Sequence, residues 1–440
     1  MIPYVTEARY PWRSGHRVQF LIDGVALYSR LLSAIQGAER QIFGAISFLQ
    51  PGFCFLNGEA FWSTMQEAAA RGVSVHLLAW RNPHFFMSKH VFQGTASERA
   101  MLADLAPNVN VRWDESPAPA HCHHQKMWLI DDTAFVGGMV LSKSTLDDHT
   151  HQRHEHGKHD SFLEFEGPAV LDVYDNFAQR WNASKTVSSH PALTPTINVP
   201  SLSLLPKGIT PLQLSRTLKP GLYETSGEAD IWAQYKLAFA HAKRTIYLEN
   251  QHPGEEQLLL LLSEAARRGV RVVYLVPGEP MQAISVERRE AEDYWRHGGQ
   301  RVPRYASTFA ALKDLANEEN FTLAALAHQE PGCAPREIYT HSKLCIVDGE
   351  WVTIGSANLV DLSLLSDHTE LNVSLWDQVE ALRLLRQLTE EHTQLSSQGK
   401  DDGALLAQLQ RHARENTARR QRNEVMQGHV YALEVSLYGV

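Results

Sequence analysis

The chain has 440 residues, of which 43% are hydrophobic and 21% charged, a balance typical of a folded globular protein. One hydrophobic core rarely serves a chain of this length, so we expect two domains or a fused pair. The formal net charge of −9 argues against a protein that wraps nucleic acid. The 22 histidines are unusually numerous, and their charge can change between about pH 5 and 7.

The cysteines and the N-terminal residues exclude two further classes of protein. Cys54, Cys122, Cys333 and Cys345 show no CxxC pair and no regular spacing, so neither a disulfide framework nor a cysteine zinc module is predicted. The first residues lack the charged and then apolar pattern of a secretory signal, and no apolar run is long enough to span a bilayer. We therefore expect a cytoplasmic protein, with export that needs no cleaved signal left open.

Short strands and helices alternate along the first 80 residues. Apolar runs predict strands at 18–22, 41–48 and 73–80, and amphipathic patterns predict helices at 26–38 and 61–70. This alternation is typical of an α/β fold whose sheet is covered by helices.

The second half of the chain repeats landmarks of the first half in the same order. Residues 38–42 are echoed by 242–246, and residues 67–73 by 264–270. A duplication with a period near half the chain is the simplest explanation. We therefore predict two tandem α/β/α lobes related by internal duplication, each with a mixed sheet covered by helices.

A proline-rich stretch marks the expected boundary between the lobes. Residues 184–211 carry five prolines among serines and threonines, a composition that suits an extended linker. Residues 1–183 would then form the N-terminal lobe and residues 212–397 the C-terminal lobe.

The C-terminal residues 398–440 are expected to add a helix and a strand. A charged helix with apolar leucines is predicted at 404–425, and its arginines are expected to face solvent. The alternating pattern at 430–437 predicts a last strand at a sheet edge.

One eight-residue pattern occurs once in each half. It has a histidine, a lysine two residues later and an aspartate five residues after the lysine, with an apolar run before the aspartate. Residues i and i+2 of a strand share a face, so the histidine and lysine of each copy point the same way. Two copies facing each other would suit a phosphate ester, because lysines can hold its oxygens while one imidazole attacks and the other protonates the leaving oxygen. The copies are His124, Lys126 and Asp131, and His341, Lys343 and Asp348.

A turn of small residues follows each copy, and an acid follows the turn. Gly138 and Gly355 would let the backbone approach a bound anion, and Ser356 and Asn358 can donate hydrogen bonds to it. Further on, each half has an acid at the start of an alternating strand, and an acid behind each histidine would fix its tautomer. These acids are Asp160 and Glu370. Asp160 closes the histidine-rich loop after the first copy, so we predict that Asp160 orients His124. As motif residues, Asp131 and Asp348 are counted with the predicted catalytic residues, and they lie where their strands end, where they would stabilise turns or flank the site.

The paired motifs, the glycine-rich turns and the segments 159–170 and 247–251 together resemble the phospholipase D superfamily over most of residues 18–390. The resemblance implies a two-lobed fold, an active site on the pseudo-twofold axis between the lobes and a covalent phosphohistidine intermediate. It implies no obligatory metal and no cofactor.

The resemblance also implies roles for the motif residues. His124 would be the nucleophile and His341 the general acid and then the base toward water, although the sequence does not order the two histidines. Lys126, Lys343 and Asn358 would hold the phosphoryl oxygens. Superfamily members usually have an asparagine in the first turn where this chain has Val140. Valine cannot bind phosphate by hydrogen bonds, so the halves of the site are expected to be unequal, with Ser142 or Asn358 compensating.

Two further groups of polar residues have two interpretations each. Glu249, Asn250 and Gln251 end a strand in the second half, and they either face the pocket or are a plain strand end. Five histidines with spacings of two and three suggest a metal site, but no cysteine joins them and charged residues flank them. We therefore predict a mobile polar loop near the site entrance and no metal. These histidines are His149, His151, His154, His156 and His159.

The predicted function is hydrolysis of phospholipids such as phosphatidylcholine at the distal phosphodiester, which yields phosphatidic acid and the free headgroup. An alcohol in place of water would give transphosphatidylation. The expected partners are a phospholipid headgroup, the membrane surface and water or alcohol as acceptor, without nucleic acid. Aromatic residues of the first lobe would either contact the bilayer or be buried. They are Phe53, Phe55, Phe85, Phe86 and Phe92.

Three alternatives remain open. A phosphatidyltransferase like cardiolipin synthase is disfavoured because no membrane helix is predicted. A nuclease of the same superfamily is disfavoured by the acidic balance of the chain. A phosphate-binding module with decayed motifs would have no catalytic activity.

Overall fold

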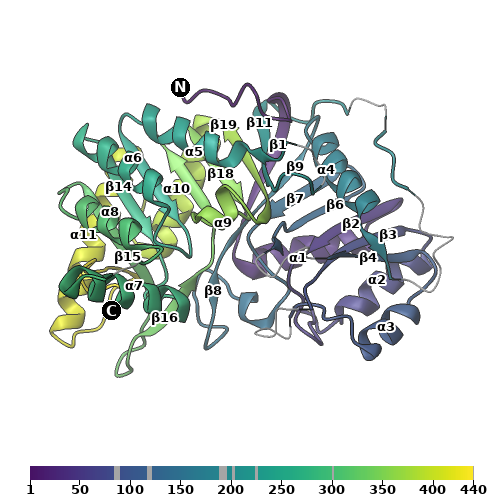
Figure 1. The fold of residues 1–440 in the computed structure, drawn as a ribbon, viewed down its shortest axis with the longest axis horizontal. Helices are drawn as coiled ribbons and strands as arrows, with labels where there is room; N and C mark the ends of the chain where they lie inside the picture. Colours follow the sequence, from purple (N-terminus) through teal and green to yellow (C-terminus); the bar gives the residue numbers. More distant parts are fainter. Residues whose placement is uncertain are drawn as a thin grey trace.

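The computed structural model describes residues 1–83, 90–115, 121–187, 196–200, 204–222, 226–299 and 302–439. Two α/β halves lie side by side, the first in purple and blue and the second in green and yellow (Figure 1). Among the described helices, none is both long and apolar enough to cross a bilayer.

The first half contains one mixed sheet. Only β2, β3 and β4 pair in parallel, and the other neighbours are antiparallel. In order across the sheet, the strands are β1 (Arg13–Ile22), β9 (Ser161–Glu166), β7 (Thr133–Gly137), β6 (Met127–Ile130), β2 (Gln41–Ile46), β3 (Ser74–Arg81), β4 (Val109–Glu115) and β10 (Lys185–Thr186). The helices of this half are α1 (Asp23–Gln36), α2 (Phe61–Ala70), α3 (Ala96–Ala103), η1 (Lys143–Thr145) and α4 (Val170–Ala183).

The sheet of the second half has the same plan, with β13, β14 and β15 parallel. Its strands in order are β12 (Glu228–Ala229), β11 (Thr210–Leu218), β19 (His368–Trp376), β18 (Trp351–Gly355), β17 (Leu344–Val347), β13 (Thr245–Glu249), β14 (Arg271–Leu275), β15 (Phe321–His328) and β20 (Val430–Ala432). The last residues of β15 also pair with β16 (Arg336–Thr340), on the side opposite to β20. Its helices are α5 (Asp230–His241), α6 (Glu256–Arg267), α7 (Gln282–His297), α8 (Ala306–Leu315), α9 (Asp361–Leu364), α10 (Gln378–Thr393) and α11 (Asp402–Gln421).

The order β1, β9, β7, β6, β2, β3, β4 recurs as β11, β19, β18, β17, β13, β14, β15, and the pairing of β1 with β11 connects the two sheets. The predicted fold class is therefore confirmed. Both faces of each sheet are covered, so successive strand residues are buried on opposite sides. Ile42 packs in the core beneath α1 and α2, whereas Phe43 packs with Phe177 of α4. That second core continues through both halves as far as Leu384 of α10.

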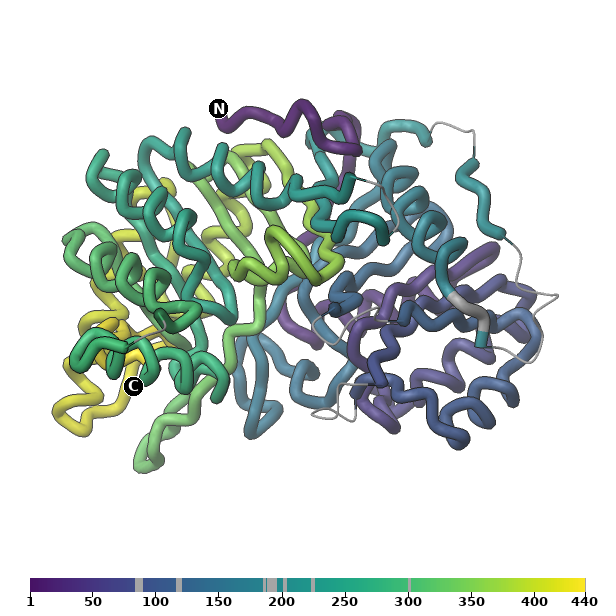
Figure 2. The backbone as a smooth tube through the Cα atoms, in the orientation of Figure 1, coloured from purple at the N-terminus to yellow at the C-terminus, as the bar shows by residue number. Residues whose placement is uncertain are grey.

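Several segment boundaries differ from the sequence prediction. β10 forms inside the predicted linker, whose residues 188–195 and 201–203 lie outside the described part of the chain. The last strand, predicted to reach residue 437, ends at Ala432, and α11 packs its leucines into the shared core. The N-terminal residues, purple in Figure 2, extend over the second half, where Trp376 Nε1 donates a hydrogen bond to the Ile2 carbonyl oxygen at 2.6 Å.

Two short strands cross between the halves. β5 (Cys122–His123) pairs in parallel with the start of β19, and β8 (Lys158–His159) pairs in parallel with the end of β16. Both short strands belong to the first half and pair with strands of the second half. The residues that follow these crossing strands form the candidate site.

Candidate active site

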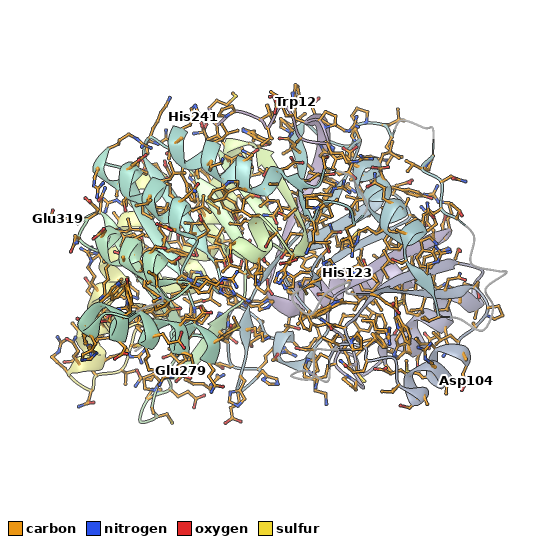
Figure 3. The ribbon with its side chains drawn as sticks, viewed as in Figure 1. Trp12, Asp104, His123, His241, Glu279 and Glu319 are labelled. Atoms are coloured by element: carbon orange, nitrogen blue, oxygen red, sulfur yellow. The ribbon has the colours of Figure 1, made fainter. Side chains whose placement is uncertain are left out.

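The two motif histidines lie where the crossing strands meet the opposite half. The His124 amide donates a hydrogen bond to the Thr369 carbonyl oxygen at 3.1 Å, and the His341 amide donates one to the His159 carbonyl oxygen at 2.8 Å. Figure 3 shows His123, the residue before the first motif histidine, at the centre of the molecule between the halves. The structure thus brings the two copies of the motif to one interface.

Each histidine is paired with the acid of the other half. His124 Nδ1 lies 2.9 Å and 3.0 Å from the two carboxylate oxygens of Glu370. His341 Nδ1 lies 2.5 Å from Asp160 Oδ2. The prediction that Asp160 orients His124 is therefore wrong, because the crossing strands place each acid beside the distant histidine. With Nδ1 held by a carboxylate, Nε2 of each ring is the nitrogen that can face a substrate.

Both imidazoles are neutral in the free site. Only 6% of His124 and 8% of His341 is exposed, and burial lowers the pKa of His124 to about 3 despite the adjacent Glu370 carboxylate. Burial also lowers the pKa of His341 well below its usual range, and the ammonium group of Lys343 acts in the same direction. A neutral imidazole is the form that can act as a nucleophile or base.

The two acids behind these histidines differ. Burial acts to raise the pKa of Glu370, but His124 and His368 outweigh it and hold this pKa below its usual range. For Asp160 burial prevails and raises the pKa to about 6, although Lys343 acts in the opposite direction. Glu370 also accepts a hydrogen bond from Ser356 Oγ at 2.5 Å. At neutral pH Glu370 is therefore the more firmly ionised partner.

The glycines of the two turns make room for side chains of the protein. A Cβ atom at Gly138 would lie 2.4 Å from Asp160 Oδ1, and one at Gly355 would lie 2.2 Å from the side-chain oxygen of Asn372. Glycine is therefore needed at both positions for close packing against Asp160 and Asn372, and the predicted contact of their backbone with an anion stays a prediction.

The motif lysines are buried beside the histidines. Lys126 Nζ donates to the His124 carbonyl oxygen at 2.6 Å, and Lys343 Nζ donates to the His341 carbonyl oxygen and, at 3.2 Å, to Gln251. Burial lowers the pKa of Lys126 to about 8 and that of Lys343 to about 7. Two buried amines next to two neutral imidazoles form a site that favours an anion.

The three polar residues at the end of β13 have different positions. Asn250 accepts a hydrogen bond from the Leu359 amide at 3.1 Å and donates to the Ala357 carbonyl oxygen at 3.4 Å, so it holds the turn that carries Asn358. The Asn358 Oδ1 atom is buried without a hydrogen-bond partner among the described residues. Gln251 contacts Lys343, whereas Glu249 contacts His159. Asn250 and Gln251 therefore border the site, and Glu249 belongs to a separate cluster.

Asp131 and Asp348 do not join the histidines. A strand rises about 3.3 Å per residue, so the step of five positions from lysine to aspartate separates these two residues by roughly 16 Å. The Asp131 carboxylate accepts hydrogen bonds from the backbone amides of residues 39–41, and Asp348 accepts from those of residues 243–245. These two aspartates stabilise the turns before β2 and β13, so their grouping with the catalytic residues is corrected.

The first turn offers no amide like that of Asn358. The carbonyl oxygen of Val140 accepts hydrogen bonds from Tyr28 at 2.6 Å and from Thr145 at 2.9 Å, and its side chain is buried. The Ser142 hydroxyl lies 2.9 Å from that of Ser144. The two turns are therefore unequal, as their sequences predict.

One residue beside the site, His368, was not predicted from the sequence. His368 lies with Nδ1 3.6 Å from Glu370, and its ring centre is 5.7 Å from that of His124. In the sequence, the position of His368 two residues before Glu370 indicates that it lies near the site. The prediction of a mobile polar loop is wrong for His151 and His159, which are fully buried between the halves.

The aromatic residues considered for membrane contact are mostly buried. Phe53, Phe55 and Phe92 pack in the outer core of the first half, because the chain after β2 folds back over α1 and α2. Phe85 and Phe86 lie outside the described residues.

Comparisons with known proteins agree with this geometry. Residues 235–395 match the family described as cardiolipin synthase, PLD-like domain. The chain is 26% identical to cardiolipin synthase B of Salmonella typhi, over 83% of this chain and 78% of that protein. It is 23% identical to phospholipase D A of Dictyostelium discoideum over 85% of this chain, but spans only 34% of that protein. A solved phosphatidylserine synthase of Haemophilus influenzae shares the fold, with a TM-score of 0.60 at 12% identity over 98% of this chain and 91% of that one.

Proposed function

The chain belongs to the phospholipase D superfamily, and we propose that it cleaves a phospholipid phosphodiester through a covalent phosphohistidine intermediate. The observation that carries this proposal is the pair of crossed histidine–carboxylate contacts, His124 with Glu370 and His341 with Asp160, beside two buried lysines. Such a site supplies a nucleophile, an acid and anion-binding groups for one phosphoryl transfer.

In the first step we assign His124 as the nucleophile. Its Nε2 attacks phosphorus while Glu370 stabilises the developing positive charge on the ring. The firmly ionised state of Glu370 supports this assignment. Lys126, Lys343 and Asn358 bind the non-bridging oxygens of the phosphate.

His341 protonates the leaving oxygen as its bond to phosphorus breaks. In the second step His341 takes a proton from the acceptor hydroxyl, whose oxygen attacks phosphorus and displaces His124 Nε2. An anionic phosphodiester between the lysines raises the pKa of His341, so this ring carries a proton when substrate is bound. Asp160 holds Nδ1 of the ring through both steps and keeps Nε2 directed at the departing and then the entering oxygen.

The acceptor we propose is the hydroxyl group of an alcohol, as in a phosphatidyltransferase. The similarity to cardiolipin synthase B over most of both chains supports this choice. The low exposure of both histidines also supports it, because a buried intermediate is protected from water. Hydrolysis to phosphatidic acid, the function predicted from the sequence, is the second candidate and is favoured by the similarity to phospholipase D A.

A product analysis tests both candidates. The purified chain would be incubated with vesicles of phosphatidylglycerol or phosphatidylcholine, with and without ethanol or glycerol, and separately with single-stranded DNA. We expect a transfer product such as cardiolipin or phosphatidylethanol to exceed phosphatidic acid. Phosphatidic acid as the sole product would assign the chain to hydrolysis. Cleavage of DNA without turnover of any lipid would overturn the proposal.

A further inference from the structure

Four buried side chains from both halves converge beside the His341–Asp160 pair. Asp23 begins α1, His151 and His159 belong to the segment before β9, and Glu391 belongs to α10 of the second half. His159 Nδ1 lies 3.0 Å from Asp23 Oδ1 and 3.0 Å from Glu391 Oε1, and His151 Nε2 lies 3.4 Å from the same Glu391 oxygen. None of the four is more than 7% exposed. We call this group the interlobe cluster.

The second nitrogen of each histidine in the interlobe cluster is held by another carboxylate. His151 Nδ1 lies 3.3 Å from Asp147, and His159 Nε2 lies 3.2 Å from Glu249. An ion at the point shared with Glu391 would require each ring to donate its N–H outward and to direct the lone pair of its other nitrogen inward. Histidines that bind metal ions have this arrangement, in which an outer carboxylate fixes the tautomer.

Four buried polar atoms of the interlobe cluster lack a hydrogen bond of good geometry within the described part of the chain. His151 Nε2, His159 Nδ1, Glu391 Oε1 and Asp23 Oδ2 have no hydrogen-bond partner among the described residues. Buried polar atoms are nearly always paired, so the three of these atoms that face one another, His151 Nε2, His159 Nδ1 and Glu391 Oε1, are available to a further partner. Ligands about 2.0–2.1 Å from a tetrahedral ion lie roughly 3.3 Å from one another, close to the separations of 3.0–3.4 Å found here.

The negative charges of the interlobe cluster also favour a bound cation. The interlobe cluster and its outer contacts contain four buried carboxylates, which are costly in a protein interior unless a positive charge compensates them. The groups that approach these carboxylates within the cluster are histidines. The carboxylates are those of Asp23, Asp147, Glu249 and Glu391.

The backbone is strained at two of the four positions. Asp23 has φ 60° and His151 has φ 53°, in the left-handed region that residues other than glycine rarely adopt. Such conformations persist where the surrounding structure compensates for them, and they concentrate at functional sites.

We propose that Asp23, His151, His159 and Glu391 bind a divalent transition-metal ion, and that the ion is Zn²⁺. Two imidazole nitrogens and two carboxylate oxygens within 4.8 Å of one another, with three separations of 3.0–3.4 Å, suit zinc, whereas magnesium and calcium prefer sets made only of oxygen. Glu391 lines a cavity of about 940 Å³ together with Asp148, His149 and Thr150, which gives an ion a route from solvent. This proposal departs from the sequence prediction of no metal at His151 and His159, and the metal-binding measurement below decides between the two.

We assign to the ion the role of positioning the His341–Asp160 pair at the interface between the two halves. The Asp23 amide donates to the Asp160 carbonyl oxygen at 2.9 Å, and the Asp160 amide donates to Asp23 Oδ1 at 3.1 Å. The His341 amide donates to the His159 carbonyl oxygen. Two of the proposed ligands are therefore bonded directly to His341 and Asp160, while Glu391 ties them to α10.

Metal binding by the unaltered chain is the first test. The full-length protein would be treated with chelator, dialysed against Zn²⁺ or Co²⁺ and analysed for bound metal, visible absorption and unfolding temperature. We expect about one ion per chain, a four-coordinate Co²⁺ spectrum without thiolate bands and an unfolding temperature that rises with free zinc. If protons on the histidines compensate the carboxylates instead, no metal binds and the unfolding temperature does not change with zinc. That result would overturn the proposal.

Variants locate the ion. Glu391→Gln removes a ligand, and Asp147→Asn alters only the group behind His151, so both should weaken zinc binding by about 10- to 100-fold or more. His156→Gln changes an exposed histidine of the same segment and should bind zinc like the unaltered chain. Equal loss in His156→Gln and Glu391→Gln would contradict the assignment. Because these measurements follow metal content and not turnover, they are independent of the proposed reaction.

Discussion

The two histidine–carboxylate pairs have the same topology and different surroundings. Glu370 has Ser356 and His368 beside it, and burial does not prevent its ionisation. Asp160 faces Gly138 and has a raised pKa. The turn of the second copy carries Asn358, whereas the first carries Val140. Duplication has kept the strand order, and the differences between the copies give each pair its own role in the proposed reaction.

The strongest test of this difference removes the histidines one at a time. His124→Asn and His341→Asn should each lower kcat by about 10⁴-fold or more, because the two rings act as one unit. Acid quenching of the unaltered chain with labelled lipid should then trap phosphate on His124. Label on His341 would reverse the assigned roles, and substantial turnover by either variant would contradict the paired mechanism.

The inequality of the two turns is tested next. Asn358→Ala removes a proposed hydrogen-bond donor to the phosphate and should lower kcat by about 10²-fold. Val140→Ala, at the matching position of the first turn, should leave kcat near that of the unaltered chain. Steady-state kinetics on vesicles measures both. Similar losses in the two variants would mean that the turns contribute equally.

The pH dependence of kcat/KM reports on the same difference. Below about pH 6 Asp160 gains a proton and no longer supports His341, and above about pH 7 Lys343 loses the charge that binds phosphate. We therefore expect a narrow, bell-shaped pH profile of kcat/KM with its maximum between these two pH values. Lys343→Arg should shift the alkaline limb upward, since a guanidinium stays charged. An unshifted alkaline limb in this variant would exclude Lys343 as its source.

The smallest catalytic effect is expected at the motif aspartates. Asp131→Asn and Asp348→Asn weaken the hydrogen bonds to three backbone amides each, and should lower the free energy of unfolding by about 1–3 kcal/mol. Their kcat values should stay near that of the unaltered chain. Urea unfolding and kinetics separate the two effects. A loss of kcat comparable to that of His124→Asn would place these carboxylates in the reaction.

The sequence by itself determined the repeated elements and the residue types of the site. Alternating apolar patterns and the spacing of His124 and Lys126 depend on neighbours in the chain, so they predict strands, helices and the shared face of each motif. The same local pattern left the roles of Asp131 and Asp348 open, because a strand pattern does not show which end of the strand lies at the interface between the two halves.

Tertiary structure alone decided which groups meet. Glu370 lies 246 positions from His124, and its place depends on β5 crossing to β19. The interlobe cluster likewise joins Asp23 and Glu391 from opposite halves around histidines that look, in the sequence, like part of a polar loop. Contacts of this kind arise when two complete sheets dock. No short pattern encodes them, because the docking depends on many buried side chains at once.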